Sequence, residues 1–218
     1  MPDGVAKTEH QPCIYVIAGT NGAGKSSVVG AAIRERGAHY FNPDEAALRI
    51  RSANPHISQE DANIAAWREG KRLLEQAVAS RLTFAFETTL GGETIAGLLQ
   101  RAIAARIAVR VWYVGLTSAE QHIARVRARV TRGGHDIPES KIRERYDRSR
   151  SNLIRLLPEL TEVRVFDNSA EADPATGSAP MPLLILHMVH GRIVAMCNLA
   201  QVPDWAKPIV VAAMKSSQ

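Results

Sequence analysis

Short apolar runs alternate with longer amphipathic segments along most of the chain. The runs are rich in β-branched and aromatic residues, as in CIYVIA at 13–18, and this composition is typical of buried strands. Strands are expected at 13–19, 38–42, 83–88, 108–116 and 162–168. Segments with a helical period separate them. The order predicts an α/β fold, a three-layer sandwich in which helices cover both faces of a mainly parallel five-stranded sheet.

The helix boundaries carry capping signals. Helices are expected at 25–36, 58–81, 93–106, 118–132 and 138–157. Ser58 with Asp61, and Ser118 with Gln121, have the spacing of a capping box, in which the hydroxyl accepts from the backbone N–H three residues later. Gly133-Gly134 is a typical helix end.

The segment after Ser169 continues beyond the five expected strands. Residues 171–182 have the composition of a loop, and two apolar runs then flank Gly191-Arg192. This pattern predicts a hairpin added to the edge of the sheet. We expect a single domain over 1–218, with a core at 13–169, a lid at about 125–150 and a C-terminal extension at 170–218.

Composition narrows the functional classes. The chain has 218 residues, of which 45% are hydrophobic, enough for one large core. Its net charge is +5, but the arginines concentrate at 125–155 and aromatic residues are few. A local anion site explains this distribution better than a surface for nucleic acid does.

Cellular location is expected to be the cytoplasm. The apolar runs are much shorter than the ~20 residues of a membrane-spanning helix, and MPDGVAKTEH at the N-terminus lacks a signal-peptide core. Cys13 and Cys197 show no metal or redox spacing and are expected to be buried free thiols. No contact with a membrane is expected.

Residues 19–26, GTNGAGKS, form a complete G-x-x-x-x-G-K-[ST] phosphate loop between an expected strand and an expected helix. Such a loop turns successive backbone N–H groups toward phosphate oxygens, so the first ligand to expect is ATP or GTP. The Lys25 ammonium suits the β- and γ-phosphates, and the Ser26 hydroxyl suits Mg²⁺. The residues expected to bind the nucleotide are Asn21, Gly22, Ala23, Gly24, Lys25, Ser26 and Ser27.

Asp44 follows the second expected strand in Asn42-Pro43-Asp44. Ligands of open α/β sheets bind at the carboxyl ends of strands, so this carboxylate could take a proton from an acceptor hydroxyl or help to position Mg²⁺. Asp44 could equally cap a helix that starts near Ala46. The sequence does not separate these roles.

Glu87 and Thr88 close the apolar strand TFAFET. An isolated carboxylate is costly to bury, so Glu87 either lies in a cleft at the strand end or makes a buried pair. We favour the cleft, where Glu87 would hydrogen-bond the acceptor.

Arginines gather in residues 124–153, ARVRARVTRGGHDIPESKIRERYDRSRSNL. Arg125, Arg129 and Arg132 lie opposite an apolar helix face, and Arg145 and Arg148 follow in the next helix. A solvated face is the simpler interpretation. The intervening Gly133-Gly134-His135 instead favours a lid that closes arginines over a triphosphate, with His135 as a hydrogen-bonding loop residue.

In this order, GTNGAGKS, FNPDEAA, FAFETTLGG, VGLTSAEQHIARVRARVTRGGHDIPESKIRERYDRS and VFDNS resemble the zeta-toxin family of small-molecule kinases. The resemblance covers about residues 13–169 and implies a P-loop kinase fold. It also implies transfer of phosphate from ATP or GTP, with Mg²⁺, to a sugar hydroxyl of UDP-N-acetylglucosamine. A further implied partner is a small helical antitoxin, which we expect on a separate chain because only twelve residues precede the first strand.

The resemblance also implies roles for the candidate residues. Lys25 and Ser26 would hold phosphate and Mg²⁺, Asp44 would be the general base, and Glu87 with Thr88 would bind the acceptor. The lid arginines would be Arg125, Arg129, Arg145 and Arg148, and Asn168 would lie near the nucleotide base.

Two other functions are compatible with these residues. One is a kinase that acts on another nucleotide-containing acceptor, such as the ribose of NAD or a nucleic-acid end. The other is a nucleotide-binding switch without an acceptor, which would not need both Asp44 and Glu87 at adjacent strand ends.

Overall fold

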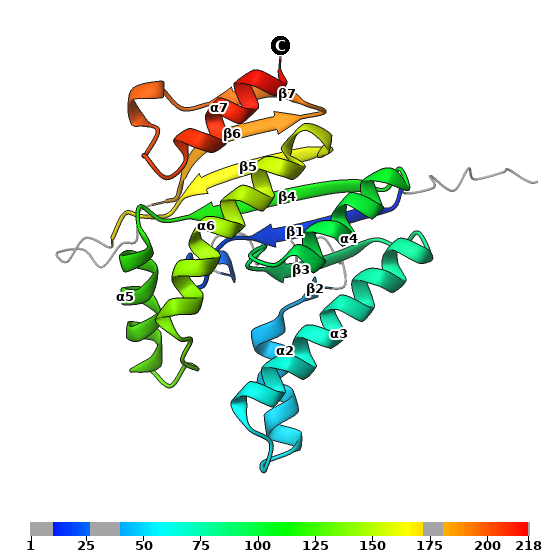
Figure 1. The fold of residues 1–218 in the computed structure, drawn as a ribbon, viewed down its shortest axis with the longest axis vertical. Coiled ribbons are helices and arrows are strands. Elements are labelled where there is room, and N and C mark those ends of the chain that lie inside the picture. Colours follow the sequence, from blue (N-terminus) through cyan, green and yellow to red (C-terminus); the bar gives the residue numbers. More distant parts are fainter. Residues whose placement is uncertain (1–10, 27–39, 172–180, 218) are drawn as a thin grey trace, which may run out of the picture.

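The fold is seen in a computed structural model that describes residues 11–26, 40–171 and 181–217. The helix expected at 25–36 lies outside these residues beyond Ser26, as does Ser27. Within the described chain, seven strands form one sheet in the order β2-β3-β1-β4-β5-β6-β7 (Figure 1). The strands are β1 Cys13–Ala18, β2 Tyr40–Phe41, β3 Phe84–Thr88, β4 Ala108–Gly115, β5 Glu162–Asp167, β6 Leu183–Val189 and β7 Arg192–Met196.

The sheet confirms the predicted α/β class. Strands β2, β3, β1, β4 and β5 are parallel, and β6 and β7 add an antiparallel hairpin at the edge, at the predicted turn. Because β1 lies in the middle, both of its faces are buried, which explains why CIYVIA is apolar throughout. The phosphate loop begins at the carboxyl end of this central strand.

The helices are α2 Pro43–Ala53, α3 Gln59–Ala79, α4 Glu93–Ala104, α5 Ala119–Val130, α6 Glu139–Leu156 and α7 Lys207–Ser216, with 3₁₀ turns at Leu157–Glu159 and Leu199–Gln201. Among the described helices, α7 was not expected, and α2 was expected only in one alternative, as a helix that starts near Ala46. Helix α2 begins directly after β2, with Pro43 at its first position. Helix α7 follows the hairpin. The capping predictions are confirmed, because Ser58 Oγ accepts from Asp61 N at 3.0 Å and Ser118 Oγ accepts from Gln121 N at 3.2 Å.

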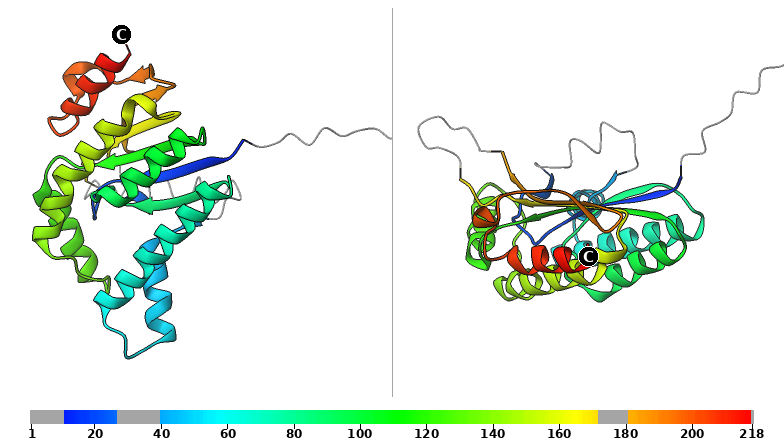
Figure 2. Two further views of the ribbon diagram at one scale, coloured as in Figure 1. Left: turned by 45° about the vertical axis from the view of Figure 1, so that its right-hand side comes forward. Right: turned by 90° about the horizontal axis from the view of Figure 1, so that it is seen from above.

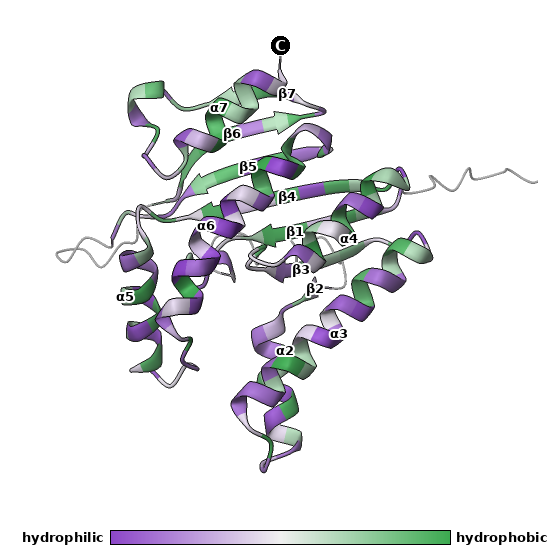
Figure 3. Ribbon diagram, viewed as in Figure 1, coloured by the Kyte–Doolittle hydropathy of each residue, from purple (hydrophilic) through white to green (hydrophobic). Residues whose placement is uncertain are grey.

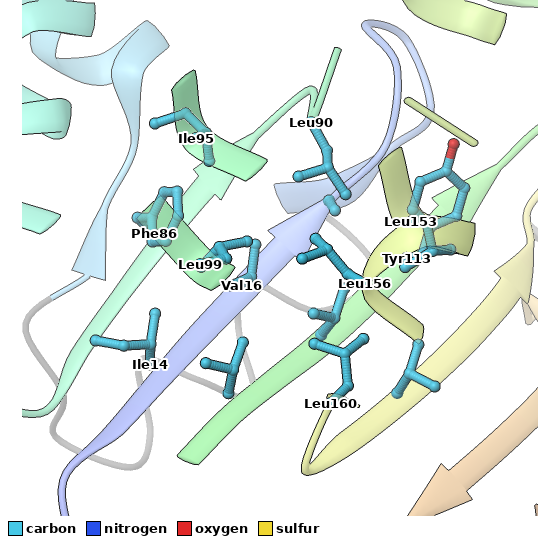
Figure 4. Close-up of a cluster of buried hydrophobic side chains, with 14 of the residues drawn as sticks. Ile14, Val16, Phe86, Leu90, Ile95, Leu99, Tyr113, Leu153, Leu156 and Leu160 are labelled. Atoms are coloured by element: carbon cyan, nitrogen blue, oxygen red, sulfur yellow. The ribbon is translucent and has the colours of Figure 1, made fainter. Parts of the chain in front are cut away.

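Helices α3, α4, α6 and α7 lie on one face of the sheet (Figure 2). Their apolar side chains meet those of the strands in the main core, which includes Val16, Phe86, Leu99 and Leu156 (Figure 4). The opposite face of the sheet carries a second apolar cluster around Ile17, Trp112 and Val114. A sheet that is apolar on both faces suits a layered α/β architecture.

The C-terminal segment is joined to the sheet by Trp205, which is only 3% exposed. Its ring lies against Gly115, where a Cβ would come within 2.4 Å of the indole. Its Nε1 donates to Asp167 Oδ1 at 2.9 Å. Residues after β7 therefore hold the carboxyl ends of β4 and β5, beside the phosphate loop. The division into core, lid and extension stays a prediction.

Within the described ranges, every helix is too short or too polar to cross a lipid bilayer.

Candidate active site

The phosphate loop has a backbone that requires glycine. Gly22 has φ +82°, and a Cβ there would lie 2.7 Å from the backbone oxygen of His122. Gly19 has φ +139°, and its Cβ would lie 2.1 Å from the Val114 oxygen. The bond from Ala23 N to Thr20 O, 3.1 Å, closes the turn. The loop therefore curls between β1, β4 and α5 in a form that leaves its backbone free to cradle an anion.

Lys25 folds back over this loop, and its Nζ donates to Gly19 O at 2.9 Å. Burial lowers the pKa of Lys25, and the Glu87 and Asp44 carboxylates oppose that shift. The ammonium is therefore held at the loop within the electrostatic influence of two carboxylates.

Glu87 ends β3 beside the loop and is 7% exposed. Its Oε1 accepts from Ser26 Oγ at 2.7 Å and from the Tyr40 hydroxyl. The carboxylate is thus both paired and at the strand end, which combines the two alternatives that the sequence left open. Thr88 also lines the cavity at this edge, and its Oγ1 accepts from Leu90 N at 3.0 Å.

Ser26 and Glu87 offer hard oxygen donors that suit Mg²⁺. In the part of the chain that the structure describes, no group of three or more His, Cys, Asp or Glu side chains could hold a metal ion. Mg²⁺ is commonly held by one or two protein oxygens together with substrate phosphates and water. The pair therefore fits an ion that arrives with a nucleotide.

Asp44 is not a helix cap. Asn42 caps α2, because its Oδ1 accepts from Asp44 N at 2.9 Å and from Glu45 N at 3.3 Å. The capping alternative for Asp44 is therefore wrong. Its carboxylate instead meets α5 and the loop that follows it, with Oδ2 3.4 Å from Arg129 Nη1 and Oδ1 3.6 Å from His135 Nε2.

The predicted lid arginines occupy different environments. Arg145 Nη1 donates to Asn21 Oδ1 in the phosphate loop at 2.9 Å, and Arg129 pairs with Asp44. Arg125 donates to Ala170 O at 3.2 Å, although its Cβ lies near Gly22. Arg148 is 65% exposed and pairs with Glu144. Arg129 thus reaches Asp44 and Arg145 reaches the phosphate loop, whereas Arg125 is bonded to Ala170 and Arg148 is largely exposed on the cavity wall.

Two further side chains hold the loop from outside. Asn168 Nδ2, beyond β5, donates to Ala23 O at 2.9 Å. His122 Nδ1 donates to Asn21 O at 2.8 Å, and its side chain is almost fully buried on α5. Sequence reasoning missed His122. The available signal was its spacing, because it lies four residues before the buried Val126 on one helix face.

We expect His122 to make stability depend on pH. Burial, followed in the same direction by the charges of Lys25, Arg125 and Arg150, lowers the pKa of His122 to about 4, although its bond to Asn21 opposes the shift. The unfolded chain then takes up a proton below about pH 6.5 that the folded chain takes up only near pH 4. The contribution of His122 to the free energy of unfolding is therefore fully present above pH 6.5. It falls by at most about 3 kcal/mol as the pH drops toward 4.

Urea unfolding at pH 7.5, 6, 5 and 4 measures this loss. The variant His122→Gln should flatten the pH dependence, and the matched control His56→Gln, on an exposed residue, should not. If the free energy of unfolding changes with pH in the same way in the wild type and in His122→Gln, the pH dependence does not come from His122.

A cavity of about 940 Å³ joins these elements. It extends from Lys25 and Asn21 past Asp44 and Glu87 and is walled by α3 on one side and by the α6 residues Lys141, Glu144, Arg145 and Arg148 on the other. In Figure 1 two pairs of helices project from the sheet on either side of this cavity: α5 with α6, called the α5–α6 arm, and α2 with α3, called the α2–α3 arm. Both arms carry long hydrophilic stretches, whereas the central strands are mainly hydrophobic (Figure 3).

A glycine loop that ends in Lys-Ser after the central strand of a parallel sheet, with acidic residues at the neighbouring strand ends, defines a P-loop kinase-like fold. The family model for Zeta toxin matches residues 3–173. The chain belongs to the zeta-toxin family, as its sequence motifs suggested.

Other proteins are similar to this chain in sequence or in fold. An uncharacterized protein of Haemophilus influenzae is 32% identical over 128 residues, which is 59% of this chain and 88% of that protein. The AvrRxo1-ORF1:-ORF2 complex with ATP is similar at a TM-score of 0.62 and 16% identity, over 93% of this chain and 64% of the matched chain. A structure from the PezAT chromosomal toxin–antitoxin system of Streptococcus pneumoniae has a TM-score of 0.57 and 12% identity, over 96% of this chain and 87% of that chain.

Proposed function

We propose that this protein is a kinase that transfers the γ-phosphate of ATP or GTP to a sugar hydroxyl of UDP-N-acetylglucosamine. The observation that carries the proposal is that Lys25, Asp44 and Glu87 line one cavity at the mouth of the phosphate loop. A nucleotide-binding switch has no need for two carboxylates beside its γ-phosphate. A kinase needs a base for the acceptor and contacts that orient it.

In the proposed reaction the acceptor oxygen attacks the γ-phosphorus while its proton passes to the Asp44 carboxylate. The bond from the γ-phosphorus to the β,γ-bridging oxygen breaks, and the nucleoside diphosphate leaves. Lys25, Arg129 and Arg145 would offset the charge of the transferring group, and Glu87 with Thr88 would orient the acceptor. Arg125 and Arg148 keep a proposed outer role in the lid.

Ser26, with the neighbouring Glu87 oxygen, would hold Mg²⁺. The bound ion would offset charge on the β- and γ-phosphates. The loop residues Asn21, Gly22, Ala23, Gly24 and Ser27 complete the proposed nucleotide site, of which Ser27 lies outside the described residues.

Family membership and cavity size support the acceptor. Small-molecule pockets range from about 300 to 1,000 Å³, and a cavity of about 940 Å³ leaves room for a nucleotide-sugar beside the γ-phosphate. We also propose a separate antitoxin chain as partner, in line with the toxin–antitoxin system to which the pneumococcal neighbour belongs.

Mass spectrometry of the products tests the proposal directly. The protein is incubated with Mg²⁺, ATP or GTP, and in parallel with UDP-N-acetylglucosamine, NAD or a 5′-hydroxyl oligonucleotide. We expect UDP-N-acetylglucosamine to gain one phosphate, and Lys25→Ala to abolish the gain. Phosphorylation of NAD or the oligonucleotide alone would retain the kinase and reject this acceptor, whereas nucleotide binding without any product would favour the switch.

A further inference from the structure

The cavity has a wall that the proposed chemistry does not use. Gln59, Asn63, Trp67 and Lys71 line it from α3, and each follows the last by four residues. That spacing places them on one helix face. The adjoining face of α3, including Ala66 and Gly70, is buried. At Gly70 a Cβ would lie 2.6 Å from the Phe41 ring, so the helix packs directly on the floor of the cavity.

Trp67 is the unusual residue of this wall because its side chain is 45% exposed. The other two tryptophans of the chain, Trp112 and Trp205, are 8% and 3% exposed. Trp67 lies on α3, whereas the phosphate loop follows β1 and Asp44 lies in the first turn of α2. A large aromatic surface is therefore presented to the cavity without serving the core.

The cavity that Trp67 lines contains apolar surface that suits a flat ring. The floor is apolar, with Phe41, Phe86 and Ile95, and Gly92 adds no side chain. A Cβ at Gly92 would meet no atom within 4 Å, so the space beside it is open. Asn63 on α3 and Lys141 on α6 are among the polar residues of the same cavity. Pockets that combine apolar and aromatic surface with polar groups that fix orientation are the usual sites for small molecules.

We infer that Trp67 is the stacking platform for the nucleobase of the acceptor, with the reacting sugar at the Asp44 end of the cavity. The inference rests on the proposed function. Bases stack on aromatic side chains through their flat faces, and loss of the aromatic ring weakens binding by roughly 10- to 100-fold. Trp67 thereby selects acceptors that carry a base and leaves the chemical step to Lys25 and Asp44.

Intrinsic fluorescence tests the contact without turnover. The full chain is saturated with Mg²⁺ and a non-hydrolysable ATP analogue, so that the donor site is filled, and is then titrated with UDP-N-acetylglucosamine, UDP or N-acetylglucosamine. We expect the two uridine nucleotides to quench the emission, because Trp67 is the exposed tryptophan, and the free sugar to leave it unchanged. The quench should disappear in Trp67→Phe.

Kinetics provide the second readout. Trp67→Ala should raise KM for UDP-N-acetylglucosamine by roughly 10- to 100-fold and change kcat by less than about twofold, with Trp67→Phe in between. The matched control is Leu48→Ala on α2, which removes another exposed apolar side chain that does not line the cavity. The control should leave both constants unchanged.

The inference and the proposed function fail in different ways. Transfer to UDP-N-acetylglucosamine with an unchanged KM in Trp67→Ala, or a quench that persists in Trp67→Phe, overturns the role of Trp67 alone. Quenching by the free sugar places the sugar against Trp67 and also overturns it. Absence of transfer to any nucleotide-sugar overturns the function, whereas quenching by UDP would still support a nucleobase site at Trp67.

Discussion

Asp44→Asn is expected to lower kcat by about 10²- to 10⁴-fold, with nucleotide affinity changed by less than about threefold. Asparagine keeps the size of the side chain, and Asn42 holds the end of α2, so the backbone should not move. What is lost is the carboxylate oxygen that we propose accepts the proton of the acceptor hydroxyl. Single-turnover rates with saturating ATP and acceptor measure the chemical step, and calorimetric titration with a non-hydrolysable analogue measures affinity.

The control for this experiment is Glu45→Gln, which removes the neighbouring charge in the first turn of α2 from a residue that does not line the cavity. It tests whether the effect belongs to the Asp44 carboxylate or to negative charge at the helix N-terminus. A fall in turnover of the same size for both variants, or an unchanged kcat for Asp44→Asn, would contradict a general-base role.

Local sequence signals were sufficient for most of the sheet and for the phosphate loop. The parallel strands are continuous apolar runs, and the helices after Ser58 and Ser118 begin with hydroxyl caps that work through contacts three residues apart. Contacts between residues that are so close in the chain can be predicted from residue type and spacing alone. The same holds for Gly22, whose positive φ is part of the loop motif.

Other features depend on contacts that sequence spacing does not specify. Helix α2 is short and begins at Asn42-Pro43, which is equally typical of a turn. His122 acquires its function through Asn21, which lies 101 residues away in the chain, and Trp67 can be placed on the cavity wall only once α3 packs on Phe41. Which arginines reach the loop likewise depends on how α5 and α6 pack against β1, and helical periodicity cannot give that packing.

Arg145→Ala is expected to lower kcat by about 10³-fold or more. The KM for ATP should change by a smaller factor. The Arg145 guanidinium is held at the phosphate loop by Asn21, and its stem packs against Gly91, where a Cβ would lie 2.8 Å from Arg145 Cγ. Burial lowers the pKa of Arg145, with the Glu144 and Asp44 carboxylates opposing the shift, but an arginine remains charged in proteins. A fixed, partly desolvated positive charge at this point stabilises the transition state more than the ground state, because negative charge accumulates on the phosphoryl group as it is transferred.

The matched control is Arg143→Ala on the same helix. Arg143 pairs with Glu120 at the surface, and exposed pairs of this kind contribute little to stability. Both variants should therefore fold, and only Arg145→Ala should lose turnover. Arg145→Lys should recover only part of the rate, because an ammonium cannot reproduce the planar guanidinium that contacts Asn21 and that we propose contacts the phosphate as well. If Arg145→Ala weakens ATP binding and leaves kcat intact, Arg145 acts in the ground state and the transition-state role is wrong.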